Sequence, residues 1–373
     1  MTTRVLFVDD EPLVLRSLDR ALRTRKVPWE ARFVDTGAGA LALLASEPFD
    51  VVVADLRIPD LDGVELLGEV QRSYPRIARL VLSGQVGTDD CLRAMRVAHQ
   101  CMAKPCNIET LRHIVGRLQL GQHLLDDELA ASATRLSCLP SPPRVYREVS
   151  NAIARDAGLA ELAGLIDGDV AITAKLLQVV NSAFFAYGSP GARGAPVTTV
   201  QRALTVLGTD VVRDLLLGVE VFRGFEGGGS SLARIEALAH HSQRVAQLAR
   251  GLAPRDLAGD AFVAGMLHDL GDLVLEILAH PARQPSDHAR AGGFLRGLWG
   301  LKDAVVDAIT HHHEPGALVD SQALVDLVHV AEIVVGELEG AAEPIDPAWL
   351  ARNGEARLAE ARALGQTLAQ PAS

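Results

Sequence analysis

The stretch DVVVADLRIPDLDG, residues 50–63, decides the fold of the N-terminal part of the chain. Its apolar run stops at Asp55 and is followed by proline and glycine, which is typical of a buried strand that ends in a turn. Apolar side chains then recur at helical spacing over residues 64–70. Because the order of strand, turn and helix is repeated on both sides of this segment, we expect one layered domain here.

Five short runs rich in apolar residues predict strands, and amphipathic segments between and after them predict helices. The predicted strands cover residues 4–8, 30–34, 50–54, 77–82 and 100–103. The predicted helices cover residues 13–22, 38–44, 64–70, 91–97 and 108–118. Strict alternation of strand and helix implies a parallel sheet with helices on both faces. We expect a flavodoxin-like α/β fold with strand order 2-1-3-4-5.

Charged and hydroxyl side chains follow the predicted strands, at the edge where doubly wound sheets place their active crevice. Asp9 and Asp10 end the first strand, Asp55 the third, Ser83 the fourth and Lys104 the fifth. The expected strand order makes the first and third strands neighbours, so that three carboxylates share one cleft. Their mutual repulsion requires a cation, and hard oxygen ligands suit Mg²⁺.

This set of charges fits the transfer of a phosphoryl group. A carboxylate can accept the group, while Mg²⁺ and an ammonium group stabilise the charge on its oxygens. We assign Asp55 as the acceptor, Lys104 as the second positive charge and Ser83 as a hydrogen-bond donor to the phosphoryl oxygens. A single Asp after a strand is more often a turn or cap residue, but matching positions at several strand ends favour a common site.

Residues 4–118 resemble the response-regulator receiver family through four motifs in the family's order: VDDEP, ADLRIPDLDG, VLSGQ and AKP. The resemblance implies a sensor histidine kinase as partner and a cis peptide bond before Pro105. It also implies a Mg²⁺ site formed by Asp9, Asp10, Asp55 and the carbonyl of Arg57.

One position departs from the family. Cys101 stands three residues before Lys104, where an aromatic switch residue is usual. We therefore do not expect the phosphoryl signal to pass from Ser83 to an aromatic rotamer.

The strand signals end after Leu118. A helical pattern continues to residue 135, the loop-like LPSPP follows at residues 139–143, and Ala- and Leu-rich helical patterns dominate from Arg144 onward. The second domain should therefore be all α. The predicted organisation is a receiver domain over residues 1–120, a helical linker over 121–138, an all-helical domain over 139–340 and a helical tail over 341–373.

Histidines are concentrated in this helical part, where nine of the twelve lie between His240 and His329. They fall on separate helical stretches, as ligands must if they meet around a metal in a helical bundle. Any one of them alone is more often a hydrogen-bonded core residue. The pair His268-Asp269 differs because an unpaired Asp269 in the apolar segment 262–275 would cost several kcal/mol.

Residues 139–338 resemble the HDOD domain, a relative of HD-type metal phosphohydrolases, through LPSPP, KLLQVVNSAFF, AFVAGMLHDLGDLVL, WGLKDAV and HHHEP. The resemblance implies a transition metal such as Fe or Mn. Its ligands by position are His241, His268, Asp269, His288, His312 and His313, with Glu332 where an Asp is usual. Related cyclic di-GMP phosphodiesterases carry a Gly-Tyr-Pro loop after their His-His pair, and this chain has none.

We interpret the chain as a phosphorylation-controlled response regulator of a two-component phosphorelay whose HDOD domain contacts an unidentified downstream protein without catalysis. The alternative makes that domain a metal-dependent phosphohydrolase acting on a cyclic dinucleotide or nucleotide. A third interpretation, direct DNA binding, is disfavoured because the formal net charge is −11 and Lys and Arg do not cluster. Homodimerisation stays open.

The N-terminus MTTRVLFVDDEP lacks the layout of a signal peptide, and no apolar run reaches the length of a membrane span. We expect a cytoplasmic protein that does not associate with membranes. The four cysteines form no CxxC pair, so we also expect reduced thiols.

Overall fold

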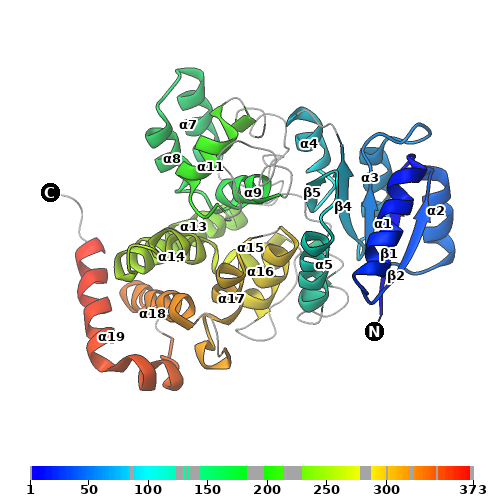
Figure 1. Ribbon diagram of the computed structural model, residues 1–373. Coiled ribbons are helices and arrows are strands. Elements are labelled where there is room, and N and C mark those ends of the chain that lie inside the picture. The colour runs from blue at the N-terminus through cyan, green and yellow to red at the C-terminus, as the bar shows by residue number, and fades with distance from the viewer. Residues whose placement is uncertain are drawn as a thin grey trace. The chain divides into compact units, whose positions relative to one another are not determined.

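The structure is a computed structural model in which the chain forms two compact units (Figure 1). One unit comprises Met1–Cys138, Gln178–Ala195 and Gly297–Gly300, and the other Leu139–Leu177, Pro196–Arg296 and Leu301–Ser373. The structure describes residues 2–84, 88–122, 129–130, 133–134, 143–182, 197–209, 211–212, 215, 229–277, 287–299, 301–318, 322–341 and 343–369.

The first unit is built on a five-stranded parallel sheet. Its order, β2-β1-β3-β4-β5, confirms the predicted order. Every strand begins and ends within one residue of its prediction. The strands are β1 (Thr3–Val8), β2 (Trp29–Val34), β3 (Val51–Ala54), β4 (Ala78–Ser83) and β5 (Gln100–Ala103).

The position of each strand explains its pattern of burial. All four residues of β3 are buried, because β3 lies in the middle of a sheet covered by helices. Edge strand β2 instead alternates between exposed and half-buried residues. The register pairs Val8 with Ala54, so Asp9 and Asp55 leave the sheet side by side.

Five helices flank the sheet: α1 (Pro12–Thr24), α2 (Gly37–Ser46), α3 (Gly63–Ser73), α4 (Thr88–Ala94) and α5 (Ile108–Gln122). The helix predicted over residues 91–97 is displaced by three residues. The chain turns after Ala94, where Val97 N–H donates to the Ala94 carbonyl, and the Val97 carbonyl accepts from the Arg79 side chain. Most of the predicted linker lies outside the described residues, but residues 129–130 and 133–134 are helical and buried.

The described part of the second unit is helical, as predicted. The helices that lie wholly or mainly in it are α7 (Pro143–Ala154), α8 (Leu159–Ile166), α9 (Val170–Asn181), α11 (Val200–Leu207), α13 (Gly229–Leu252), α14 (Ala258–Leu267), α15 (Leu270–Ile277), α16 (Asp287–Leu298), α17 (Asp303–His311), the 3₁₀ turn η1 (Pro315–Ala317), α18 (Gln322–Glu339) and α19 (Pro347–Ala369). Residues 139–142 of the LPSPP motif lie outside the described residues.

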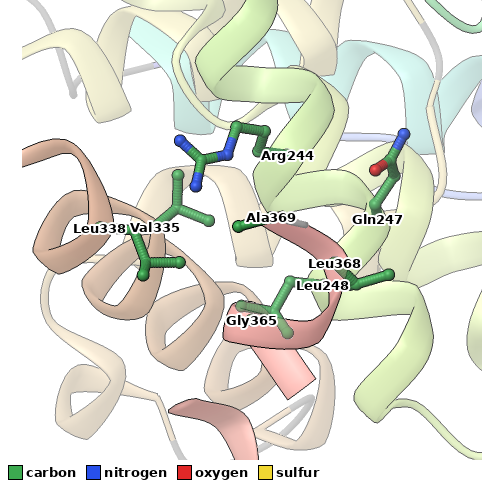
Figure 2. Close-up of a pocket in the computed structure, with 8 residues that line it drawn as sticks. All are labelled: Arg244, Gln247, Leu248, Val335, Leu338, Gly365, Leu368 and Ala369. Carbon is green, nitrogen blue, oxygen red and sulfur yellow. The ribbon is translucent and has the colours of Figure 1, made fainter. Parts of the chain in front are cut away.

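Helix α13 packs against α14, α18 and α19. Figure 2 shows a small pocket at the junction of α13, α18 and α19, lined by Arg244, Gln247, Leu248, Val335, Leu338, Gly365, Leu368 and Ala369. Across the residues that the structure describes, no helix has the length and apolar character that a membrane span requires.

Candidate phosphoacceptor site and candidate metal centre

The carboxyl ends of β1, β3 and β5 bring the predicted acceptor, Asp55, next to an acid and a lysine. Lys104 Nζ lies 2.8 Å from Asp55 Oδ2 and 2.7 Å from Asp9 Oδ2. The Leu56 backbone N–H donates to Asp55 Oδ1 over 2.7 Å, so each oxygen of this carboxylate has its own partner. The Lys104–Pro105 peptide bond is cis, which confirms the expectation.

In this cleft, one ammonium group pairs closely with the carboxylates of Asp9 and Asp55. Burial by itself would lower the pKa of Lys104, but Asp55 and Asp9 outweigh it and raise that pKa. Burial raises the pKa of Asp9, against the effect of Lys104. Asp9 Oδ2 is buried, and the Lys104 ammonium is its cationic partner.

Glu11 is a site residue that the sequence reasoning missed. Acidic oxygens of Asp9, Glu11 and Asp55 lie within 4.8 Å of one another, and Glu11 Oε1 is 3.3 Å from Lys104 Nζ. Its position in the VDDEP motif could have identified Glu11 as a site residue. Asp10 is not in this group, so its role as a ligand stays a prediction.

The sequence also singled out Arg57 and Ser83 for this cleft and Cys101 for the switch position. The ligand role of the Arg57 carbonyl stays a prediction, and the Arg57 side chain lies 3.7 Å from Asp90. The side chain of Ser83 lies outside the described residues, although Ser83 is the last residue of β4 as expected. Cys101 is a buried cysteine on β5, paired in register with Val81.

In the second unit, the structure brings together all seven side chains predicted as metal ligands. Local breaks between helices place several of them. His268 caps α14, Asp269 lies between α14 and α15, and His312 caps α17. A Cβ on Gly271 would lie 1.7 Å from the His288 carbonyl, so only glycine lets α15 and α16 approach this closely.

Four of the ligands form one cluster around Glu332 on α18. Glu332 Oε2 lies 2.9 Å from His241 Nε2 and 2.6 Å from His268 Nε2, and Asp269 Oδ2 lies 3.2 Å from the same atom of His268. The Nε2 atom of His268 is fully buried and faces these two carboxylates. A metal ion would use the lone pair of such a nitrogen.

The other three ligands form a second cluster in which imidazole nitrogens converge. His288 Nε2 lies 2.9 Å from His313 Nε2 and 3.3 Å from His312 Nε2. Asp269 joins the two clusters, because its Oδ2 faces His268 while its Oδ1 lies 3.2 Å from His288 Nε2 and 3.8 Å from His312 Nε2. This arrangement provides two adjacent ligand sets with one shared carboxylate.

The outward-facing nitrogen of each imidazole points to an acceptor, as in metal sites where a second partner orients the ligand. Two of these acceptors are main-chain carbonyls and three are carboxylates that the sequence reasoning missed. The acceptors are Glu339 Oε2 (2.7 Å from His241 Nδ1), Gly265 O (2.7 Å from His268), Asp272 Oδ1 (3.7 Å from His288), Ile309 O (2.8 Å from His312) and Glu343 Oε2 (3.0 Å from His313).

Electrostatics differ between the two clusters. Burial would lower the pKa of His268, but Asp269 and Glu332 outweigh burial and hold that pKa well above its usual value. In the second cluster burial, together with the charge of His313, holds the pKa of His312 well below its usual value. His312 therefore offers a neutral nitrogen, the form that binds metals.

The fold and the two sites define a class: a phosphoacceptor domain followed by an HD-type helical domain. Residues 5–116 match the family model of the response regulator receiver domain, residues 139–285 that of the HDOD domain and residues 238–345 that of the HD domain. The chain thus carries a response regulator receiver domain, followed by a helical region that matches the HDOD and HD domains.

The relatives match parts of the chain. The hydrogenase transcriptional regulatory protein HoxA of Cupriavidus necator is 38% identical over 136 residues, 34% of this chain and 28% of that protein. An uncharacterized protein of Treponema pallidum is 28% identical over 238 residues, 57% of this chain and 45% of its own length. The chain therefore spans less than half of the length of either relative.

Two solved structures resemble parts of the chain. The MmoQ response regulator of Methylococcus capsulatus is 22% identical, covers 60% of this chain and 98% of its own, and has a TM-score of 0.48. The signal receiver domain of an HD domain-containing protein from Pseudomonas fluorescens is 26% identical, covers 33% of this chain and 98% of its own, and has a TM-score of 0.31.

Proposed function

We propose that the output domain of this response regulator is a metal-dependent phosphohydrolase with two divalent transition metals, controlled by phosphorylation of Asp55. The observation that carries the proposal is Asp269, whose two carboxylate oxygens face two separate sets of ligands. A metal pair bridged by one carboxylate is typical of enzymes that hydrolyse phosphate esters.

The ligand types indicate the metal class. Imidazole nitrogens with a few carboxylate oxygens suit Mn, Fe or Zn, whereas Mg²⁺ prefers oxygen ligands alone. His241, His268, Asp269 and Glu332 would hold one ion, and His288, His312 and His313, with Asp269, the other. Glu332 has one methylene more than the usual Asp, and its Oε2 nevertheless reaches His241 and His268.

When bound, such a metal pair supplies an activated water and polarises a phosphoryl oxygen. The chain's own residues prepare the site for this. Glu339 accepts a hydrogen bond from His241, and Glu343 Oε2 lies 3.0 Å from His313 Nδ1. These two contacts favour the ring orientation in which the other nitrogen faces inward. A phosphodiester such as a cyclic dinucleotide is the substrate class that we propose.

Control by the receiver rests on the cleft around Asp55. Receiver domains of response regulators typically interact with sensor kinases, and Asp9, Glu11 and Asp55 offer the oxygen ligands that Mg²⁺ prefers. Phosphorylation adds roughly two negative charges. It acts by shifting the population of two existing states of the protein.

Metal analysis and a hydrolysis assay test the proposal on the full-length protein. We expect two Mn²⁺ or Fe²⁺ per chain and turnover of bis(p-nitrophenyl) phosphate or cyclic di-GMP. Asp269→Asn should abolish both, while His240→Ala, which changes the exposed neighbour of His241, should change neither. Two bound metals without turnover of any phosphodiester would refute the enzyme function.

The second candidate is an interaction module without catalysis. The lack of a Gly-Tyr-Pro loop after His312-His313 favours it, as do Leu338 and Leu368, which line the pocket of Figure 2 and are 38% and 46% exposed. This candidate gains support if the purified protein carries metal but hydrolyses nothing.

A further inference from the structure

We infer that His329 is a positioning residue for the second metal cluster, and that the backbone N–H of Asp346 fixes the tautomer in which it acts. The inference rests on the proposed metal site. Asp346 and helix α19 lie beyond residue 345, where the HD family match ends.

His329 makes a hydrogen bond with each of its nitrogens. It is 2% exposed, on α18. Its Nε2 accepts from the Asp346 backbone N–H over 3.1 Å, so Nε2 carries no proton. Its Nδ1 must then carry the proton, and it donates to the His312 carbonyl over 2.6 Å. A donor from Asp346 thus fixes the tautomer that His329 presents to His312.

The bond to His312 acts on two ligands at once. The His312 carbonyl belongs to the peptide group that joins His312 to His313, and both side chains are ligands of the second cluster. This carbonyl lies at the end of α17, where carbonyl groups have no partner within the helix. Because this carbonyl accepts a hydrogen bond from His329, the orientation of the peptide group that joins the two ligands is fixed.

Asp346 is itself firmly held. Helix α18 ends at Glu339, and Gly340 adopts a φ of 79°, a left-handed conformation that glycine allows. The chain then reverses, and Asp346 caps α19 by accepting from the Trp349 N–H over 2.8 Å. The indole of Trp349 is 1% exposed and donates to the Asp326 carbonyl on α18.

Two substitutions separate the two hydrogen bonds of His329. In His329→Asn the amide nitrogen takes the place of Nδ1 and can still donate to His312. In His329→Gln the amide group takes the place of Nε2, so the contact with Asp346 is kept and the bond to His312 is lost. Thr173→Val is the matched control, because it removes a buried hydrogen bond, from Thr173 Oγ1 to the Ile166 carbonyl, that touches neither His329 nor Asp346.

Mn²⁺ titration of the full-length variants by equilibrium dialysis, with EPR to detect coupled Mn²⁺ pairs, tests the inference. We expect His329→Gln to bind the second Mn²⁺ about 10–100-fold more weakly and to keep the first. His329→Asn should stay within about threefold of wild type at both sites, and Thr173→Val should lower the melting temperature but keep both affinities.

The outcomes are distinguishable. If wild type binds two Mn²⁺ and His329→Gln does so equally well, the role of His329 is refuted and the proposed function stands. Equal weakening of both sites, or the same loss in Thr173→Val, would show a merely structural role. Loss of the second Mn²⁺ in His329→Asn would also overturn the inference, without depending on the folding of the Gln variant. Fewer than two Mn²⁺ in wild type refutes the metal pair and this inference together.

Discussion

Replacing Arg79 by lysine should release residues 133–134 from the receiver. Arg79 lies on β4 with 1% of its surface exposed. Its guanidinium donates to three carbonyls from three segments: Val97 (2.6 Å), Ile77 (3.2 Å) and Thr134 (2.8 Å). Thr134 belongs to the predicted linker, so Arg79 is one group that holds this part of the linker against the sheet.

The size of the effect follows from these contacts. Lysine keeps the positive charge, but its single ammonium cannot reach all three carbonyls. Losing two hydrogen bonds from a charged donor, each about 1.5–3 kcal/mol, lowers the free energy of local opening by about 3–6 kcal/mol. Because 1.4 kcal/mol is a factor of ten, amide exchange should be faster by about 10²–10⁴.

Hydrogen exchange with mass spectrometry on the full-length protein measures this change. We expect the acceleration in peptides that cover β4, β5 and residues 133–134, and little change in peptides from β2. Arg93→Lys is the matched control, since Arg93 is 56% exposed and makes only long ion pairs. Exchange at residues 133–134 of Arg79→Lys within threefold of wild type would refute the reasoning.

Three further outcomes are expected. Acetyl phosphate with Mg²⁺ should label the wild-type protein. The Asp55→Asn variant should not be labelled, because its amide cannot accept a phosphoryl group. Labelling of this variant would show that the acceptor is another residue. Asp269→Asn should weaken Mn²⁺ binding at both sites by more than the roughly 10–100-fold that follows from removing a partner of a ligand. His313→Ala should weaken Mn²⁺ binding at the second site only. Equilibrium dialysis with EPR distinguishes these two outcomes. Burial lowers the pKa of His241, but Glu332 outweighs burial and raises that pKa to about 9. Because Mn²⁺ must then displace a proton from His241, the Mn²⁺ affinity should rise by up to about tenfold per pH unit between pH 7 and 9. A Mn²⁺ affinity that does not change with pH over this range would contradict the prediction.

Much of the receiver could be predicted because its signals are local. The apolar runs and the residues that end them placed Asp9, Asp55 and Lys104 at strand ends, and parallel alternation brought these ends to one edge. The end of α4 depended on a contact distant in sequence, the bond from Arg79 to the Val97 carbonyl. The helical periodicity of the sequence does not reveal such a contact, so it could not predict where α4 ends.

In the output domain, the inner ligands were predictable and their outer partners were not. The motifs that place His268, Asp269 and His312 are continuous in the sequence. Glu339 reaches His241 from the last turn of α18, and Glu343 reaches His313 after the chain reverses at Gly340. Nothing in their sequence context marks either residue. In burial, His329 does not differ from an ordinary core histidine. The role that we propose for it depends on its contact with the His312 carbonyl.

The two sites of this chain differ in donor chemistry. The receiver cleft presents carboxylate oxygens of Asp9, Glu11 and Asp55, which suit Mg²⁺. The output site presents five imidazole nitrogens with two carboxylates, which suit transition metals far better than Mg²⁺. Millimolar Mg²⁺ can therefore support phosphorylation of Asp55 without filling the site around Asp269. The state of the receiver and the metal content of the output domain can thus be set independently in one sample, which makes control of one by the other measurable.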